Sequence, residues 1–90
     1  MRFQWNASKA KLNIQRHKVT FTEATEAFFD PNAVDDFDPD HSDEEARYNL
    51  IGLSSRRLLF VVYTERGNTV RIISARKAEK KHRRIYEYGK

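Results

Sequence analysis

The chain has 90 residues, a formal net charge of +4 and no cysteine. A chain of this length folds as one domain, because hydrophobic cores of this size do not usually divide. The lack of cysteine excludes disulfides and thiolate metal sites. No apolar run approaches the length of a membrane span, and no charged and then apolar signal segment begins the chain. We therefore expect a cytoplasmic protein that has no membrane partner.

The charge is unevenly distributed along the chain. Residues 30–45 contain eight acidic side chains and no Lys or Arg, whereas residues 66–90 contain nine Lys or Arg and two acidic side chains. A basic final third predicts a polyanionic partner such as nucleic acid. A solvated basic helix has the same composition, so both interpretations stay open.

Two short helices are expected in the first third of the chain. Asn6 suits an N-cap, since its side chain can accept a hydrogen bond from one of the free amides that begin a helix at residues 7–17. Thr20 and Glu23 match the S/T-x-x-E capping box that begins a second helix. Apolar residues then recur at helical spacing until Pro31 ends the run.

Strand patterns dominate the middle of the chain. At the N-terminus of the chain, Phe3 and Trp5 alternate with polar residues, which indicates a short strand or an apolar anchor. A short strand is expected near residues 33–37, and three stronger strand patterns follow at residues 47–54, 58–64 and 69–76. The second of these three is apolar on both faces, so it should be the most buried strand. In regular pairing, Arg71 and Arg76 lie on opposite faces of the third.

Helical spacing returns near the C-terminus, where His82, Ile85 and Tyr86 share one face. The acidic stretch at residues 35–45 has little apolar periodicity, which is typical of an exposed loop. The elements together predict a single α+β domain over residues 1–90. In it, two N-terminal helices pack on an antiparallel β-sheet meander, which is followed by a C-terminal helix.

Several segments occur in an order and spacing that cover nearly the whole chain. They are residues 3–6 (FQWN), 13–17 (NIQRH), 19–24 (VTFTEA), 38–42 (DPDHS), 64–67 (TERG), 71–78 (RIISARKA) and 83–87 (RRIYE). With the pair Glu45 and Arg47, these segments resemble the BrnT family of toxin–antitoxin toxins. One position departs from the family pattern, because Lys18 stands where the family usually has Gly. A glycine there suits a helix C′ position at positive φ.

The resemblance implies a fold akin to that of the RelE ribonucleases and a ribonuclease toxin that inhibits translation and growth. It also implies a BrnA-type antitoxin with a ribbon-helix-helix DNA-binding part, which neutralises the toxin. The complex of the two proteins would repress its own operon, so operator DNA would be contacted only through the antitoxin complex. The resemblance implies no cofactor.

Metal-independent RNA cleavage uses the neighbouring 2′-hydroxyl as nucleophile. It needs a base for that proton, cations for the charge on the phosphoryl oxygens, and an acid for the departing 5′-oxygen. Arg76 and Lys77, at a strand-to-helix junction, are the preferred phosphate binders, and Arg47 could face the same cleft. The alternative role for Arg76 is an ion pair with Glu23 or Glu79.

Three side chains are candidates for proton transfer. His17 ends the first helix on its inner face, where it could be catalytic or simply packed in the core. His41 lies among acidic residues, an environment that suits a general acid, although a hydrogen-bonding role in the loop is an equal alternative. Glu45 could act as a base or could orient Arg47.

The basic C-terminal segment supplies the candidate RNA-binding residues. They are Lys77, Lys80, Lys81, Arg83, Arg84 and Tyr86. Tyr86 could stack on a splayed base, but it shares the apolar helix face, so core packing competes with that role. The acidic residues 35–40 lack the EF-hand pattern, and no metal site is expected. Two other functional classes stay open, namely a non-catalytic nucleic-acid-binding module and a protein-interaction domain.

Overall fold

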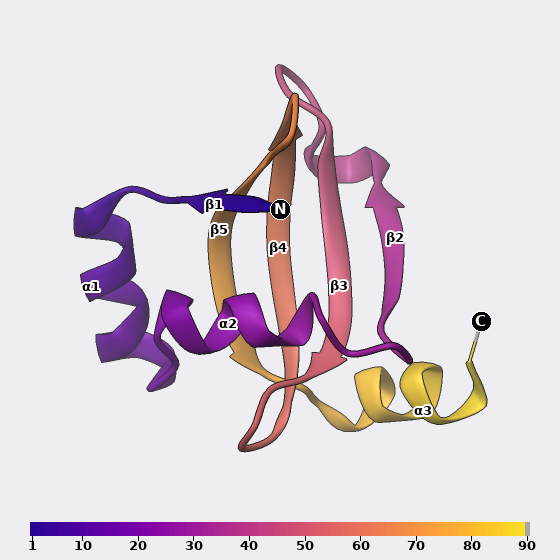
Figure 1. Cartoon of the computed structure of the whole chain (residues 1–90). Coiled ribbons are helices and arrows are strands. Elements are labelled where there is room, and N and C mark those ends of the chain that lie inside the picture. The colour runs from indigo at the N-terminus through magenta and orange to yellow at the C-terminus, as the bar shows by residue number, and fades with distance from the viewer. Residues whose placement is uncertain (90) are drawn as a thin grey trace.

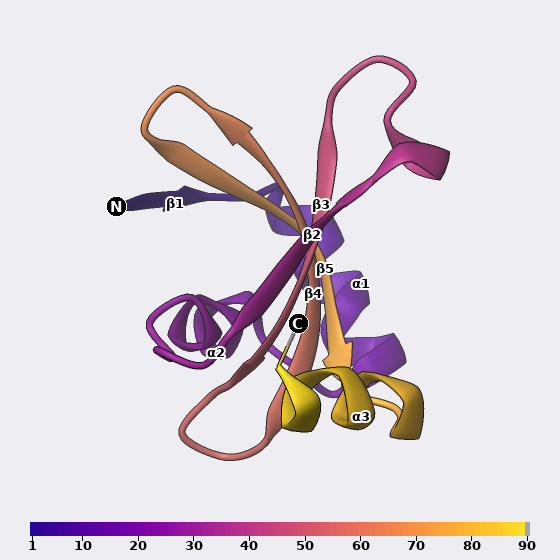
Figure 2. The ribbon, with the colours of Figure 1, turned by 90° about the vertical axis from the view of Figure 1, so that its right-hand side faces the viewer.

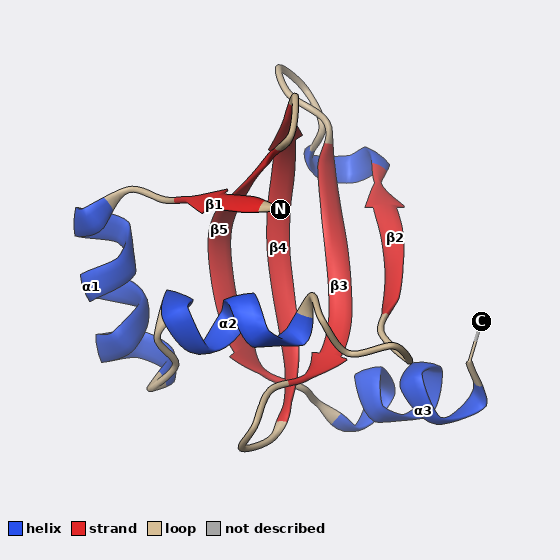
Figure 3. Cartoon of the chain, viewed as in Figure 1, coloured by secondary structure: helices blue, strands red, loops and turns tan. Residues whose placement is uncertain are grey.

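The computed structural model describes residues 1–89, and in that part of the chain three α-helices accompany a five-stranded sheet (Figure 1). In chain order the elements are β1 (Arg2–Gln4), α1 (Ala7–His17), α2 (Phe21–Ala27), β2 (Val34–Asp38), the 3-10 helix η1 (Pro39–His41), β3 (Arg47–Leu53), β4 (Leu58–Arg66), β5 (Thr69–Lys77) and α3 (Lys80–Tyr88). The strands lie side by side in the order β1-β5-β4-β3-β2 (Figure 3). No helix among these residues is long and apolar enough to cross a membrane.

The predicted α+β class and the meander from β3 to β5 are confirmed, with one addition. β1 pairs with β5 in parallel, whereas the other neighbouring strands pair antiparallel. The sheet is therefore mixed and not purely antiparallel. The Phe3 ring of β1 packs edge-on against Phe28 at the end of α2, with 5.3 Å between the ring centroids. This aromatic contact holds the short first strand against the rest of the domain.

Helices α1 and α2 begin where the capping patterns predict. Asn6 Oδ1 accepts a hydrogen bond from the Lys9 amide at 3.0 Å, and Thr20 Oγ1 accepts one from the Glu23 amide at 2.9 Å. The Glu23 carboxylate does not complete the capping box, because it is bound by the Arg57 guanidinium at 2.8 Å. The capping-box prediction is thus confirmed for Thr20 and wrong for Glu23, whose charge is better satisfied by a cation than by an amide.

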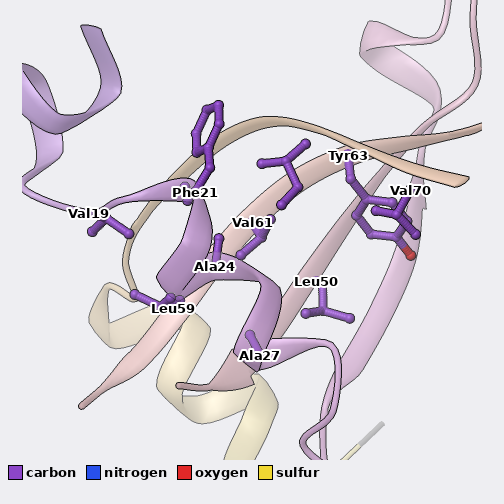
Figure 4. Packing of buried hydrophobic residues seen from close by; sticks show 11 residues of the cluster. Val19, Phe21, Ala24, Ala27, Leu50, Leu59, Val61, Tyr63 and Val70 are labelled. Carbon is purple, nitrogen blue, oxygen red and sulfur yellow. The ribbon is translucent and has the colours of Figure 1, made fainter. Parts of the chain in front are cut away.

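The core lies between α2 and one face of the sheet. Figure 2 shows α2 and α3 on opposite sides of the sheet. On the α2 side, Leu59 and Val61 of the central strand β4 pack with Phe21 and Ala24, and each of the four is at most 2% exposed (Figure 4). Full burial of such large apolar side chains stabilises the fold by about 1.5–3 kcal/mol each. The prediction that residues 58–64 form the most buried strand is confirmed.

Helix α1 lies along the edge of β5, beyond the part that β1 covers (Figure 3). Its buried Asn13 side chain takes the place of a neighbouring strand there. Asn13 Nδ2 donates to the Ala75 carbonyl at 2.8 Å, and the Ala75 amide donates to Asn13 Oδ1 at 3.1 Å. At Ala75, both backbone groups at the edge of β5 are therefore satisfied by a side chain.

The C-terminal end of α1 contains Lys18, the position at which the sequence departs from the pattern that it resembles. Lys18 has φ 58° and ψ 33°, the left-handed conformation in which glycine lacks the Cβ penalty. Lys18→Gly is expected to raise the free energy of unfolding by about 0.5 kcal/mol, measured by denaturant titration. Lys18→Ala is the control, since it shortens the side chain and keeps Cβ. Equal or lower stability of the glycine variant would show that this conformation carries little strain.

Candidate active site

A β-bulge in β5 brings two arginines to the same face of the sheet. On one side of the bulge Arg71 pairs with Thr64, and on the other side Arg76 pairs with Phe60. Thr64 and Phe60 are four residues apart on β4, so they share a face, and their partners share it too. The prediction that Arg71 and Arg76 lie on opposite faces was wrong, because it assumed regular pairing.

This face is the one opposite α2, and we call part of it the open face. It comprises Arg47, Asn49, Val62, Thr64, Arg71, Ser74 and Arg76. All of these are half-buried except Thr64, which is buried. The open face thus combines three arginines with the uncharged polar side chains of Asn49, Thr64 and Ser74.

A row of polar residues crosses the open face perpendicular to the strands. Arg47 pairs with Thr64, Thr64 with Arg71, and Arg71 with Gln4 of β1. The Arg71 Nη1 donates to Gln4 Oε1 at 2.7 Å. Adjacent strands are about 4.8 Å apart, so the Cα atoms of Arg47 and Arg71 lie roughly 10 Å apart, on either side of Thr64. The buried Thr64 hydroxyl has no hydrogen-bond partner within residues 1–89.

Glu45 lies at the end of this row, among three arginines. Its carboxylate accepts from Arg66 Nε at 2.7 Å and from Arg66 Nη2 at 3.2 Å. The Arg66 hydrogen bond lowers the pKa of Glu45, and the charges of Arg71 and Arg47 act in the same direction. A carboxylate held in its ionised form by arginines is a weak general base at neutral pH. The partner that Glu45 orients directly is Arg66, and not Arg47 as expected.

His41 is paired with a carboxylate beside Arg47. The His41 Nδ1 lies 2.9 Å from Asp38 Oδ2, and Asp38 is the cross-strand partner of Arg47. With Nδ1–H donating to Asp38, the other ring nitrogen of His41 is free for proton transfer. His41, Glu45 and Arg47 line one hollow of about 390 Å³. The side chain of His41 is 67% exposed, so a substrate can reach it.

His17 belongs to a different part of the molecule. It is half-buried on α1 and lines a hollow of about 230 Å³ together with Arg16, Ile73 and Ser74. Strands β5, β4, β3 and β2 lie between this hollow and His41. Three interstrand spacings alone amount to roughly 14 Å, so the structure does not bring the two histidines to one phosphate.

Arg76 is held over an aromatic stack where α3 meets the sheet. Its Cζ atom lies 5.2 Å from the centre of the Phe60 ring, and the His82 ring stacks on Phe60 with 4.1 Å between centroids. The ion pair of Arg76 with Glu79 is long, at 4.0 Å. The other expected partner, Glu23, binds Arg57 instead. The side chain of Arg76 is 41% exposed, so part of its guanidinium can be reached by a ligand.

The remaining basic candidates lie outside the open face. Lys77 pairs with Leu59, which places it on the α2 side at the end of β5. Lys80, Lys81, Arg83 and Arg84 are exposed on α3. The Tyr86 hydroxyl donates to Asp30 Oδ2 at 2.7 Å, and burial followed by this hydrogen bond raises the pKa of Tyr86 to about 12. The Tyr86 hydrogen bond thus links α3 to the segment that follows α2.

Several members of the open face were not among the residues selected from the sequence. Thr64 and Arg71, and the neighbouring Arg66 that binds Glu45, fall in segments that carry the family resemblance, which was the available signal. Their grouping depends on strand register, which local patterns do not give. Within residues 1–89, no group of three or more His, Asp or Glu side chains is arranged to hold a metal ion.

A known protein family matches most of this chain. Residues 5–82 match a family model described as the ribonuclease toxin BrnT of type II toxin–antitoxin systems. No curated protein matches the chain significantly. The matched range begins just after β1 and ends in the first turn of α3, so it includes all of the open face. The chain belongs to the BrnT family of ribonuclease toxins of type II toxin–antitoxin systems.

Proposed function

We propose that the open face cleaves RNA without a metal ion, by attack of the 2′-hydroxyl on the adjacent phosphate. The observation that carries the proposal is the row in which an unpartnered Thr64 hydroxyl lies between Arg47 and Arg71. The two arginine forks supply the donors that a phosphate needs as negative charge grows on its oxygens. The Thr64 hydroxyl is buried between them, so it donates to the phosphate only once the side chains that cover it move aside. In many enzymes, stabilisation of such developing charge contributes more to the rate than any other effect.

In this reaction the 2′-oxygen forms a bond to phosphorus while the bond from phosphorus to the 5′-oxygen breaks. The products are a 2′,3′-cyclic phosphate and a free 5′-hydroxyl. The 2′-oxygen gives up its proton and the departing 5′-oxygen takes one up. His41, oriented by Asp38, makes one of these two transfers, and solvent water makes the other. Arg76 binds a neighbouring phosphate, and His17, with Ser74, contacts the chain farther along the strand edge. Glu45 keeps Arg66 in place instead of removing the proton.

The basic surface of α3 extends the binding site through long-range attraction of the RNA backbone. Lys77, Lys80, Lys81, Arg83 and Arg84 contribute to it as charges and not as fixed contacts, because they are exposed. Tyr86 contributes by holding α3 in position.

A type II toxin acts together with an antitoxin protein and on an RNA target. We further propose, from the resemblance in sequence, that the antitoxin is of the BrnA type and that the complex represses its own operon. A RelE-like fold and action in the cytoplasm belong to the same proposal. The three arginines of the open face, Arg47, Arg71 and Arg76, are the surface that an antitoxin would have to cover or neutralise.

The test is incubation of the purified protein with RNA in the presence of a chelator, followed by analysis of the new ends. Fragments with 2′,3′-cyclic phosphates, formed at the same rate with and without chelator, are expected. Cleavage that the chelator abolishes, or 3′-hydroxyl ends, would contradict the mechanism. RNA that is bound but stays intact would favour the alternative of a non-catalytic binding module.

A further inference from the structure

A hollow lies between the sheet and α3, next to the open face, with which it shares Asn49. It encloses about 370 Å³. Its walls are the apolar side chains of Ile51, Phe60 and Ile85 and the ring of His82. Ile85 is 48% exposed although it is apolar, so this wall is open to a ligand. A flat ring with apolar faces fits such walls.

Besides His82, the polar residues that line this hollow are Asp35, Asp36 and Asn49. The Asp35 carboxylate accepts a hydrogen bond from the Tyr63 hydroxyl, which leaves the other two. Asp36 of β2 and Asn49 of β3 are direct cross-strand partners, so their Cβ atoms are roughly 5 Å apart on the same face. Both residues line the hollow. In the described part of the chain, neither side chain takes part in a hydrogen bond or an ion pair. The hollow therefore presents a free carboxylate and a free amide next to apolar walls.

We propose that this hollow binds a guanine base of the RNA substrate. The inference rests on the proposed function and adds base selection to it. An ionised carboxylate only accepts hydrogen bonds, so Asp36 matches a base edge with two adjacent N–H donors. Guanine has such a pair at N1 and N2, with the O6 acceptor beside it for the Asn49 amide. The Watson–Crick edges of adenine, cytosine and uracil each lack two adjacent donors.

The hollow is close enough to the proposed phosphate site for one nucleotide to reach both. Asn49 follows Arg47 by two residues on β3, which corresponds to roughly 7 Å along the strand. Arg76 packs on Phe60, which is itself a wall of the hollow, and its Nε is buried without a partner. A guanine in the hollow would thus place its own phosphates beside Arg47 and Arg76.

The test uses nucleosides, so that base binding is measured apart from cleavage. Guanosine is titrated into the isotope-labelled full-length protein, and amide shifts are followed by NMR. Shifts centred on Asp36, Asn49 and Ile85 are expected for guanosine and not for adenosine, cytidine or uridine. Asp36→Asn should weaken guanosine binding roughly 10- to 100-fold, the range for loss of a two-bond base contact. Glu87→Gln removes one exposed carboxylate from α3 and should bind guanosine normally.

A parallel experiment maps cleavage sites on a random RNA pool with the same variants. We expect preferred cleavage next to guanine in the wild type and loss of that preference in Asp36→Asn, with cleavage elsewhere maintained. Guanosine binding without any RNA cleavage would support the hollow and contradict the proposed function. Cleavage with no response to guanosine, and with unchanged preference in Asp36→Asn, would overturn the guanine site alone. Shifts in the hollow caused by an antitoxin peptide but by no nucleoside would overturn it as well.

Discussion

Replacing Arg71 with alanine is expected to slow RNA cleavage by roughly 100- to 1000-fold, the usual cost of losing one donor to a developing oxyanion. Arg71 pairs with Thr64 across the sheet, opposite Arg47, and its guanidinium is positioned by Gln4 at 2.7 Å. A lysine at this position keeps the charge but loses the two-pronged geometry, so Arg71→Lys should recover only part of the activity. The measurement is the single-turnover rate on a short RNA at saturating protein.

The matched control for this experiment is Arg56→Ala. Arg56 is an exposed arginine in the β3–β4 turn, so the variant has the same change in net charge. Its cleavage rate should stay within a few-fold of the wild type, and the melting temperatures of the two variants should be similar. A rate for Arg71→Ala within tenfold of the wild type would remove Arg71 from the site.

Replacing Arg57 with alanine is expected to lower the free energy of unfolding by about 3 kcal/mol, because it leaves a buried carboxylate without its cation. Glu23 is only 7% exposed, and it accepts from Arg57 Nη2 at 2.8 Å and from Arg57 Nε at 3.0 Å. The same guanidinium donates to the Lys18 carbonyl at 2.8 Å. This ion pair therefore joins α2, the end of α1 and the β3–β4 turn. Denaturant titration measures the loss.

The exposed ion pair between Arg66 and Glu45 serves as the control for stability. Arg66→Ala should leave the melting temperature nearly unchanged, because solvent screens exposed charges. An equal loss of stability in Arg66→Ala and Arg57→Ala would show that burial of Glu23 does not strengthen its ion pair.

The Arg57 pair also predicts how stability depends on pH. The hydrogen bond from Arg57 lowers the pKa of Glu23 below its ordinary value of 4.5. The folded state thus gains stability from this carboxylate above pH 4.5, and it loses that contribution as the pH falls through the lower folded pKa. Arg57→Ala should flatten this part of the acid-side profile, measured as unfolding free energy between pH 6 and pH 3 at roughly half-unit steps. An unchanged profile would assign the acid sensitivity to other carboxylates.

Local chemistry predicted much of the fold from the sequence. The caps at Asn6 and Thr20 were visible because short polar side chains bind helix amides three residues on. The central strand was visible because Leu59 and Val61 alternate with other apolar residues. The parallel pairing of β1 was not visible, since each β1 residue pairs with a β5 residue 67 positions later in the chain.

The candidate site was predicted less well, for a geometric reason. One extra residue in β5 reverses the face on which every later side chain of that strand points. The bulge therefore places Arg76 beside Phe60 on the face that holds Arg71, and no local pattern marked it. The selection of Arg47 and His41 survives as part of the proposal because both lie at one end of that face.

The open face is tested most directly by locating where RNA binds before it is cleaved. An RNA oligonucleotide with 2′-deoxy nucleotides cannot be cut by 2′-hydroxyl attack, so its complex with the wild-type protein is stable enough for NMR titration. We predict that the largest amide shifts centre on Arg47, Thr64 and Arg71, with smaller shifts on α3 and none on α2. Shifts confined to α3, or centred on α2, would contradict the assignment of the open face as the site of RNA cleavage.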